Sequence, residues 1–156
     1  MYRNQLISIL KNDPFTKDVF QDVYPIDLLP EKVERFPAAI IANTDESNED
    51  GEHWVTFYFP NRYIGEFFDS YGNAAYDLDY RFYNFMNTIC RKRSKFYYNT
   101  KILQGPSSKV CGHYCLYYIL NRSRGLTANS IIEQFGMDNV YNDFIVKDII
   151  DQYLSV

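Results

Sequence analysis

Apolar and polar side chains alternate along two neighbouring stretches of the chain, residues 53–60 and 64–69. Alternation with a period of two predicts β-strands, and the Pro-Asn-Arg-Tyr sequence around the junction of the two stretches is a turn signal. We therefore expect a β-hairpin over residues 53–69. The continuous apolar run over residues 38–44 predicts a buried strand, and a further strand is expected over residues 96–104.

Helical spacing, in which apolar residues recur every three or four positions, marks much of the remaining chain. Because helices and strands are mostly segregated along the sequence, we expect an α+β fold, with a small mixed β-sheet packed against the helix that starts at Cys111. Residues 15–37 are rich in proline and are expected to be irregular, and residues 45–51 to form an acidic loop. The expected helices span residues 2–11, 76–93, 111–121, 127–135 and 141–154.

The composition indicates a packed globular protein. Hydrophobic residues make up 46% of the 156 positions and aromatic residues 18%, which argues for a substantial core and against disorder. We expect a single domain over residues 1–156. No stretch resembles a signal peptide or reaches membrane-spanning length, and the three cysteines are not spaced as a secreted disulfide framework, so we expect a reducing intracellular compartment. The net charge of −4 gives no general reason to expect nucleic-acid binding.

Cys111 carries the strongest chemical signal. A loop rich in Gly, Pro and Ser, residues 104–108, leads to this cysteine at the start of an apolar helix. Backbone N–H groups at a helix N-terminus favour negative charge, so they lower the pKa of a thiol and can also hold an oxyanion. Gln104, seven residues upstream, would add a side-chain N–H donor to the same oxyanion.

An acylating cysteine needs a base, and the chain has two histidines. His113 lies two residues beyond Cys111 on the same expected helix, about 200° around its axis, so its ring should point away from the thiol. His53 and Asp69 are placed symmetrically about position 61 of the expected hairpin, which would make them cross-strand neighbours with Cβ atoms about 5 Å apart. A carboxylate there would orient the imidazole and stabilise the imidazolium.

Each of these residues also has a purely structural interpretation. Cys111 alone could be an inert buried thiol, since free cysteine is among the most buried residue types. Asp69 could only cap a turn, and Gln104 could only hydrogen-bond the loop backbone. Cys115, one turn beyond Cys111, is expected to pack in the core, and no fourth ligand is spaced to complete a zinc site with these cysteines and His113.

Three blocks of the sequence carry a family resemblance. They are residues 38–54, ending in Gly-Glu-His-Trp; residues 68–72, Phe-Asp-Ser-Tyr-Gly; and residues 104–112, Gln-Gly-Pro-Ser-Ser through Cys-Gly. In these blocks the chain resembles the adenovirus protease (adenain) family, within the broader group of cysteine proteases that includes SUMO-specific proteases. The order His, acid, Gln, Cys, with seven residues from Gln to Cys, is similar to that of adenain.

The resemblance implies a role for each candidate residue. Cys111 would be the nucleophile, His53 the general base and acid, and Asp69 the carboxylate that orients His53. Gln104 and the Cys111 backbone N–H would form the oxyanion hole, and Trp54 would line a narrow substrate cleft. Such enzymes tend to cleave after small, often Gly-containing, sequences.

The implied function is a cysteine endopeptidase that cleaves viral or virus-like element precursor proteins. The nearest alternative is a protease that removes ubiquitin or a SUMO-type modifier, and a non-catalytic binding module on the same fold ranks lower. We expect no cofactor and no metal, protein or peptide substrates, no membrane association, and a monomer in the host cytoplasm or nucleus, or packaged in a virion. An activating peptide is left open, but residues 94–103 contain no cysteine that matches the disulfide link of the adenovirus enzyme. DNA as a cofactor is not expected, because the chain is acidic, with a pI of about 5.1.

Overall fold

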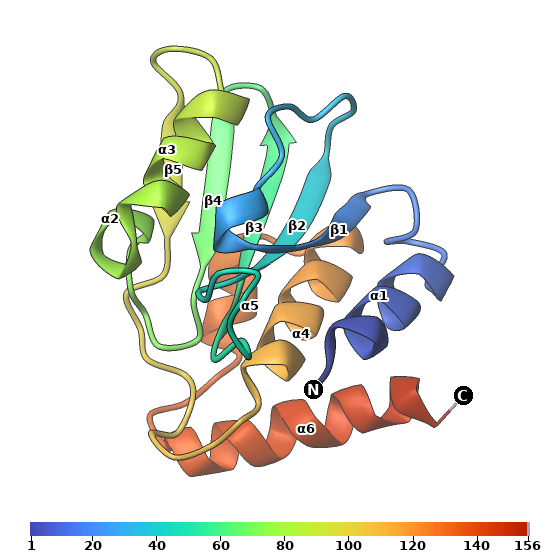
Figure 1. Cartoon of the computed structure of the whole chain (residues 1–156). Coiled ribbons are helices and arrows are strands. Elements are labelled where there is room, and N and C mark those ends of the chain that lie inside the picture. The colour runs from blue at the N-terminus through green and yellow to red at the C-terminus, as the bar shows by residue number, and fades with distance from the viewer. Residues whose placement is uncertain (156) are drawn as a thin grey trace.

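A computed structural model describes residues 1–155 as a five-stranded mixed β-sheet with helices on both faces (Figure 1). The strands follow one another across the sheet in chain order, and the two outer pairs, β1–β2 and β4–β5, are parallel while the inner pairs are antiparallel. The strands are β1 (Phe20–Pro25), β2 (Ala38–Asn43), β3 (Trp54–Asn61), β4 (Ile64–Phe68) and β5 (Lys95–Tyr98). The helices are α1 (Arg3–Asn12), the short 3-10 helix η1 (Ile26–Leu28), α2 (Ala75–Leu78), α3 (Tyr80–Ile89), α4 (Cys111–Ser123), α5 (Ala128–Glu133) and α6 (Asn139–Leu154).

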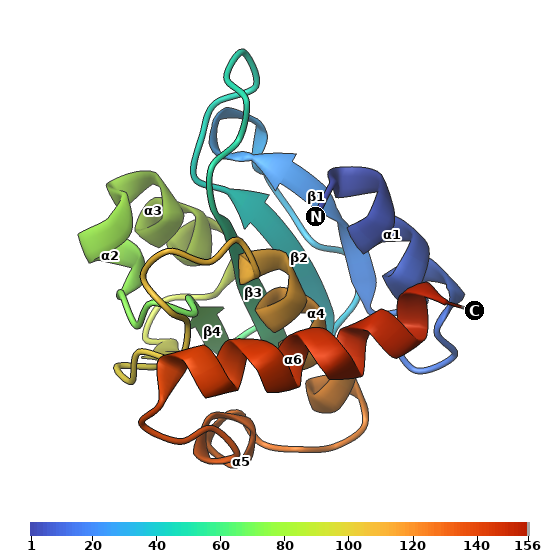
Figure 2. The same ribbon diagram turned by 90° about the horizontal axis from the view of Figure 1, so that it is seen from below.

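Two hydrophobic cores lie on opposite faces of the sheet. Helix α4 packs on one face together with α1 and α6, and α2 and α3 cover the other face (Figures 1 and 2). Strand β3 supplies both cores, because its side chains alternate: Tyr58 packs on the α4 side, whereas Phe57 and Phe59 pack on the α3 side. The predicted α+β class, and the sheet packed against the helix that begins at Cys111, are confirmed.

Three of the predicted elements need correction. Residues 15–37 are not wholly irregular, since they contain β1, in which Phe20 and Val23 are the buried residues. Their spacing of three matches no strand alternation, which is why the pattern did not indicate a strand. The predicted helix 76–93 is two helices, because Asp79 leaves the helical conformation and its side chain caps α3 by accepting a hydrogen bond from the Arg81 N–H.

The predicted strand 96–104 ends at Tyr98. Beyond it the chain leaves the sheet and hydrogen-bonds the end of the β3–β4 hairpin. The Asn99 side chain bonds the Asp69 backbone, and the Leu103 N–H donates to the Ser70 carbonyl. Strand β4 ends at Phe68, so a longer β5 would have no strand to pair with. The hydrogen bonds from the segment after β5 instead satisfy the backbone N–H and C=O groups of the residues that follow β4.

The predicted hairpin register is wrong by two residues, although the pair that it was meant to explain does form. Thr56 lies opposite Phe68, so the hairpin is symmetric about position 62 rather than 61. When one strand of a hairpin shifts by an even number of residues relative to the other, each side chain stays on the same face of the sheet. His53 and Asp69 each lie one residue beyond a strand end, where the ladder no longer fixes their spacing, and they meet there.

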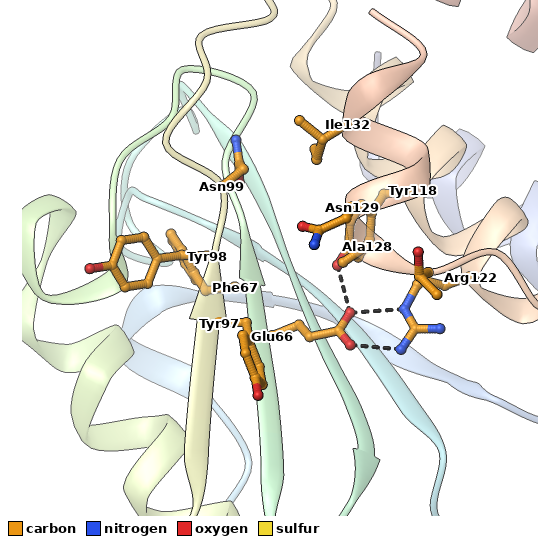
Figure 3. Close-up of a pocket in the computed structure, with 11 residues that line it drawn as sticks. Glu66, Phe67, Tyr97, Tyr98, Asn99, Tyr118, Arg122, Ala128, Asn129 and Ile132 are labelled. Carbon is orange, nitrogen blue, oxygen red and sulfur yellow. Dashed lines mark hydrogen bonds and ion pairs between the residues drawn. The ribbon is translucent and has the colours of Figure 1, made fainter.

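A buried ion pair ties the sheet to α4. Arg122 of α4 donates from Nε and Nη2 to the two carboxylate oxygens of Glu66 on β4, at 2.9 and 2.7 Å. The Tyr118 hydroxyl donates to the same carboxylate at 2.6 Å, and the guanidinium lies over the Tyr58 ring, 4.6 Å from its centroid. Figure 3 shows the pair on one wall of a pocket of about 220 Å³ between β5 and α5. Because both charges are paired in two parallel hydrogen bonds, burial is tolerated.

Removing one charge of this pair should destabilise the fold strongly. We expect Arg122→Ala to lower the free energy of unfolding in urea by about 3 kcal/mol or more, because it leaves the Glu66 carboxylate buried without a counter-charge. The control is Arg81→Ala, at an exposed ion pair with Asp79 and Glu46, which should cost less than about 1 kcal/mol. Equal losses in the two variants would show that the buried pair has no special role.

Candidate active site

Cys111 is the first residue of α4, and its side chain is nearly buried, with 8% of the residue exposed. The residue before it, Val110, has no side chain that can cap the helix, so the first N–H groups of α4 are left without side-chain acceptors. The Trp54 backbone N–H donates to the Cys111 Sγ at 3.5 Å. The thiol therefore lies where backbone donors favour a negatively charged sulfur.

His53 and Asp69 meet as predicted. His53 Nε2 lies 2.6 Å from Asp69 Oδ1, and the Cys111 side chain is close enough to contribute to the raised pKa of the imidazole. Since Nε2 is engaged by the carboxylate, the thiol is left to Nδ1. The Tyr71 ring packs beside the imidazole, with centroids 5.2 Å apart. The structure thus brings Cys111, His53 and Asp69 together, with His53 hydrogen-bonded to Asp69.

The Asp69 carboxylate is fully buried and fully hydrogen-bonded. Its Oδ1 accepts from His53 and from the Tyr71 N–H, and its Oδ2 accepts from the backbone N–H and the side-chain amide of Asn73. The Asn99 side chain bonds the Asp69 backbone on both sides, accepting from its N–H and donating to its carbonyl. Burial raises the pKa of Asp69, but the hydrogen bond and charge of His53 and the backbone donors outweigh it, and the net pKa is lowered.

The protonation states of His53 and Cys111 are coupled. Burial lowers the pKa of His53, but the hydrogen bonds to Asp69 and Cys111 outweigh burial and raise that pKa to about 9. Burial raises the pKa of the Cys111 thiol, but the hydrogen bonds from His53 and the Trp54 N–H outweigh it, and the net pKa is lowered. Both directions favour the thiolate–imidazolium pair over the neutral pair, and the thiolate is the reactive form of a nucleophilic cysteine.

Gln104 is buried beside this pair, with 1% of its surface exposed. Its Oε1 accepts a hydrogen bond of 2.6 Å from the Ser70 hydroxyl, and its Nε2 donates to the Ser108 carbonyl and hydroxyl at 3.1 and 3.0 Å. Ser70 thus turns the NH₂ group of Gln104 toward Ser108, three residues before Cys111. In this structure the amide hydrogen-bonds its own loop, as the structural interpretation predicts.

The loop that carries Gln104 is held from two sides. The Gly105 N–H donates to the Asp143 carboxylate of α6, and the Tyr71 hydroxyl donates to the Gly105 carbonyl at 3.3 Å. Asp143 also accepts from the Tyr114 hydroxyl at 2.8 Å. A side chain at position 105 would approach Asp143 Oδ2 to 2.7 Å, so glycine is required for this contact. The loop geometry therefore depends on residues far apart in the sequence.

Trp54 borders a cleft next to the thiol. Its indole Nε1 donates to the Met1 carbonyl at 3.3 Å, and its ring lies against Gly112, where an added Cβ would come within 3.3 Å of both Trp54 and Met1. A pocket of about 430 Å³ opens beside the indole, between the first residues of the chain, the end of β1 and the loop that joins β2 to β3. The structure thus places Trp54 on the wall of this pocket.

The remaining cysteines and His113 lie away from the thiol. The ring of His113 faces α6, with Nε2 3.9 Å from Asp151 Oδ1, which confirms the predicted orientation. Cys115 is 1% exposed, and burial raises its pKa well above the ordinary value. Burial also raises the pKa of Cys90 to about 11, so neither thiol is a reactive handle. Within residues 1–155, no group of three or more metal-binding side chains is present, and no helix is long and apolar enough to cross a membrane.

The sequence analysis missed the residues that support the candidate catalytic groups. The Phe-Asp-Ser-Tyr-Gly block contains two of them, but nothing in its spacing indicates what those side chains contact. Ser108 lies in the loop before α4, and the others come from near β5, α2 and α6, regions whose approach to the site only the tertiary fold reveals. These supporting residues are Ser70, Tyr71, Asn73, Asn99, Ser108 and Asp143.

Together the fold and the geometry bring a thiol, an imidazole and a carboxylate together at the start of a helix that packs on a mixed sheet. The model of the adenovirus endoprotease family matches residues 18–140, and the chain belongs to this family. That segment includes Cys111, His53, Asp69 and Gln104. No curated protein matches the chain significantly.

Two solved structures resemble the fold. The crystal structure of the ASFV pS273R protease matches with a TM-score of 0.65 at 17% identity, over 93% of this chain and 65% of that chain. The chain thus spans just under two thirds of the length of that protease. The central domain of the uncharacterized Lpg1148 protein from Legionella pneumophila matches with a TM-score of 0.61 at 14% identity, over 100% of this chain and 98% of that one. At these identities both matches describe the fold alone.

The coupled pair should give a defined pH dependence. We expect iodoacetamide to alkylate Cys111 at a pH below the ordinary thiol value of about 8.5, because the imidazolium stabilises the thiolate. His53→Ala should move the onset of alkylation upward toward that value. For peptide cleavage, kcat/KM should rise with the ionisation of Cys111 and fall as His53 loses its proton near pH 9. An unchanged alkylation profile in His53→Ala would contradict the coupling.

Ser70 should act on the reaction through Gln104. Ser70→Ala removes the hydroxyl that orients the amide, so we expect kcat for peptide cleavage to fall by about tenfold with KM nearly unchanged, because an oxyanion donor acts only in the transition state. The matched control is Ser107→Ala, an exposed serine on the same loop, which should leave both constants unchanged. A raised KM with an unchanged kcat in Ser70→Ala would show that Ser70 does not position Gln104.

Proposed function

We propose that this chain is a cysteine endopeptidase that works through an acyl-enzyme. The observation that carries the proposal is the hydrogen bond between Asp69 and His53 beside the Cys111 thiol, with the pKa of His53 raised and that of Cys111 lowered. Membership of the adenovirus endoprotease family supports the same assignment. Each side chain has the partner that its role requires.

The geometry suggests the order of the proton and bond changes. The Cys111 thiolate attacks the scissile carbonyl, forming the S–C bond, and the negative charge moves to the carbonyl oxygen. The Cys111 backbone N–H and the Gln104 amide stabilise that oxyanion after the amide exchanges its bond to Ser108 for one to the oxygen. His53 then gives its proton to the departing amine as the C–N bond breaks, which leaves a thioester and a neutral imidazole.

Hydrolysis of the thioester restores the enzyme. The neutral His53 takes a proton from water, the hydroxyl attacks the thioester carbonyl, and the C–S bond breaks to return the thiolate. Asp69 keeps its negative charge throughout and stabilises the imidazolium each time it forms. The substrate class that we propose is viral or virus-like precursor proteins cleaved after small, Gly-containing sequences, with Trp54 on the wall of the cleft.

Activity-based probes test this function directly. We expect a short Gly-Gly-type peptide vinyl sulfone to form an adduct at Cys111 in the wild type, and none in Cys111→Ala. His53→Ala should slow adduct formation by about 10³-fold or more, since the thiolate loses its base. Intact-protein mass spectrometry measures the adduct, and Cys90→Ala is the control that should still react.

The same experiment separates the candidate functions. Ubiquitin and SUMO vinyl sulfones are offered in parallel. Reaction with the peptide probe alone supports a precursor-processing protease, whereas preferential reaction with a modifier probe would replace it by the deconjugating alternative. Absence of any adduct, in protein that is folded by circular dichroism, would contradict the catalytic assignment and favour a binding module.

A further inference from the structure

The cleft beside Trp54 has a charge character that the proposed function does not explain. The Trp54 backbone N–H lies 3.5 Å from the Cys111 Sγ, and the same residue borders the pocket of about 430 Å³. An extended peptide advances about 3.3 Å per residue, so a substrate bound at the thiol enters this pocket within a few residues. We propose that this pocket is a subsite for a lysine or arginine side chain that precedes the scissile bond. This inference rests on the proposed protease function.

The part of the substrate that reaches the pocket follows from the chemistry. The departing amine must lie against His53, which gives it a proton, and Tyr71 packs on that ring. The pocket is lined by neither His53 nor Tyr71. The acyl part of the substrate, which precedes the scissile bond, is therefore the part that extends along Trp54.

Acidic side chains line this pocket on the loop between β2 and β3, which Figure 2 shows extending from the ends of these strands. Glu46 is already paired with Arg81 at 2.8 Å. In contrast, Asp45, Glu49 and Asp50 form no salt bridge with any residue in the described part of the chain, 1–155. Three carboxylates without a paired cation therefore line one wall of the pocket.

Arg3, which lines the opposite wall, does not offset this charge. Arg3 is paired with Asp22 at 3.0 Å and donates to the Val23 carbonyl, so its guanidinium is already engaged. The loop is also fixed in shape, because Asp45 accepts from the Gly51 N–H and Glu49 from the Glu46 N–H. The result is an ordered, negatively charged cleft rather than a mobile acidic tail.

A buried amide independently indicates that the pocket receives a peptide. Asn43 is only 5% exposed and lines the pocket; its Oδ1 accepts from the Asp45 N–H at 2.8 Å, but its Nδ2 has no hydrogen-bond partner among residues 1–155. A side chain at Gly51 would come within 3.0 Å of that Nδ2, so the glycine leaves the donor uncovered. An unpartnered amide donor at the edge of a cleft suits a main-chain carbonyl of an extended peptide.

The expected preference is moderate. Exposed carboxylates interact weakly with a cation one by one, and the interaction is screened by salt. Acting together within a cleft, they should favour a basic over an acidic side chain by about tenfold at low ionic strength, and by much less at about 1 M salt, where the Debye length is about 3 Å.

Peptide binding to the inactive variant Cys111→Ala tests the subsite without requiring catalysis. Fluorescein-labelled peptides that share one Gly-containing sequence carry Lys, Ala or Glu at the second, third or fourth position before the scissile bond. We expect the Lys peptide to bind about tenfold tighter than the Glu peptide at one of these positions, with the Ala peptide between them. Equal affinities for the three peptides at every position would overturn the proposal.

A charge reversal assigns the effect to the loop. Glu49→Lys with Asp50→Lys, in the Cys111→Ala background, should reverse the order of the Lys and Glu peptides while leaving the Ala peptide nearly unchanged. The matched control is Glu133→Lys with Asp148→Lys, exposed positions on α5 and α6 that give the same change in net charge and should preserve the order. Reversal in both double variants would show a general charge effect and would contradict a subsite.

The outcomes also separate this inference from the proposed function. In the wild type, kcat/KM for the same peptides should follow their affinities. Charge-selective binding without cleavage would support the subsite and contradict the protease assignment. Cleavage of all peptides at equal rates, with equal affinities, would leave the protease assignment standing and overturn the subsite.

Discussion

The hydrogen bond between the buried Asp69 carboxylate and His53 is the interaction on which the rest of the site depends. A carboxylate with no exposed surface is tolerated only when its oxygens are satisfied. Here the donors are His53, Tyr71 and Asn73, and they converge because β3 and β4 end where they do. Asn99 then ties the Asp69 backbone to the segment after β5. One buried charge thus dictates how three separate segments meet, and it sets the orientation and the raised pKa of His53.

The two histidines show that the neighbours, not the residue type, create this chemistry. His53 has a carboxylate at 2.6 Å and a thiol on its other nitrogen, and its pKa is raised. His113 is also buried, but its carboxylate lies 3.9 Å away and its Nδ1 has no partner within residues 1–155, so burial dominates and its pKa is lowered. His113 lies two residues along the helix from Cys111 but is a packing residue. His53 is distant in sequence, yet it is the residue that lowers the pKa of the Cys111 thiol.

Local patterns in the sequence predict the candidate reactive groups better than they predict the structures that hold them. A helix start at Cys111 and a hairpin that joins His53 to Asp69 follow from periodicity and turn residues. The predicted hairpin register was wrong by an even number of residues, so it still placed His53 and Asp69 on the same face of the sheet. Strand β1 was missed because it is an edge strand in which only Phe20 and Val23 are buried. The role of Asn99 could not be predicted, because a polar side chain after a strand has many possible partners and only the tertiary fold selects one.

The two halves of the site therefore depend on contacts of different range. The base side is built within the β3–β4 hairpin and the residues just beyond it, which are close in sequence. The oxyanion side needs Ser70 to orient Gln104 and Asp143 of α6 to hold Gly105, contacts that span more than thirty residues each. The family model matches residues 18–140, so Asp143 lies outside the matched segment. The four candidate residues thus lie within the matched segment, while Asp143 of α6 supports the Gln104 loop from beyond it. Disturbing α6 should therefore affect the loop before it affects the His53–Asp69 pair.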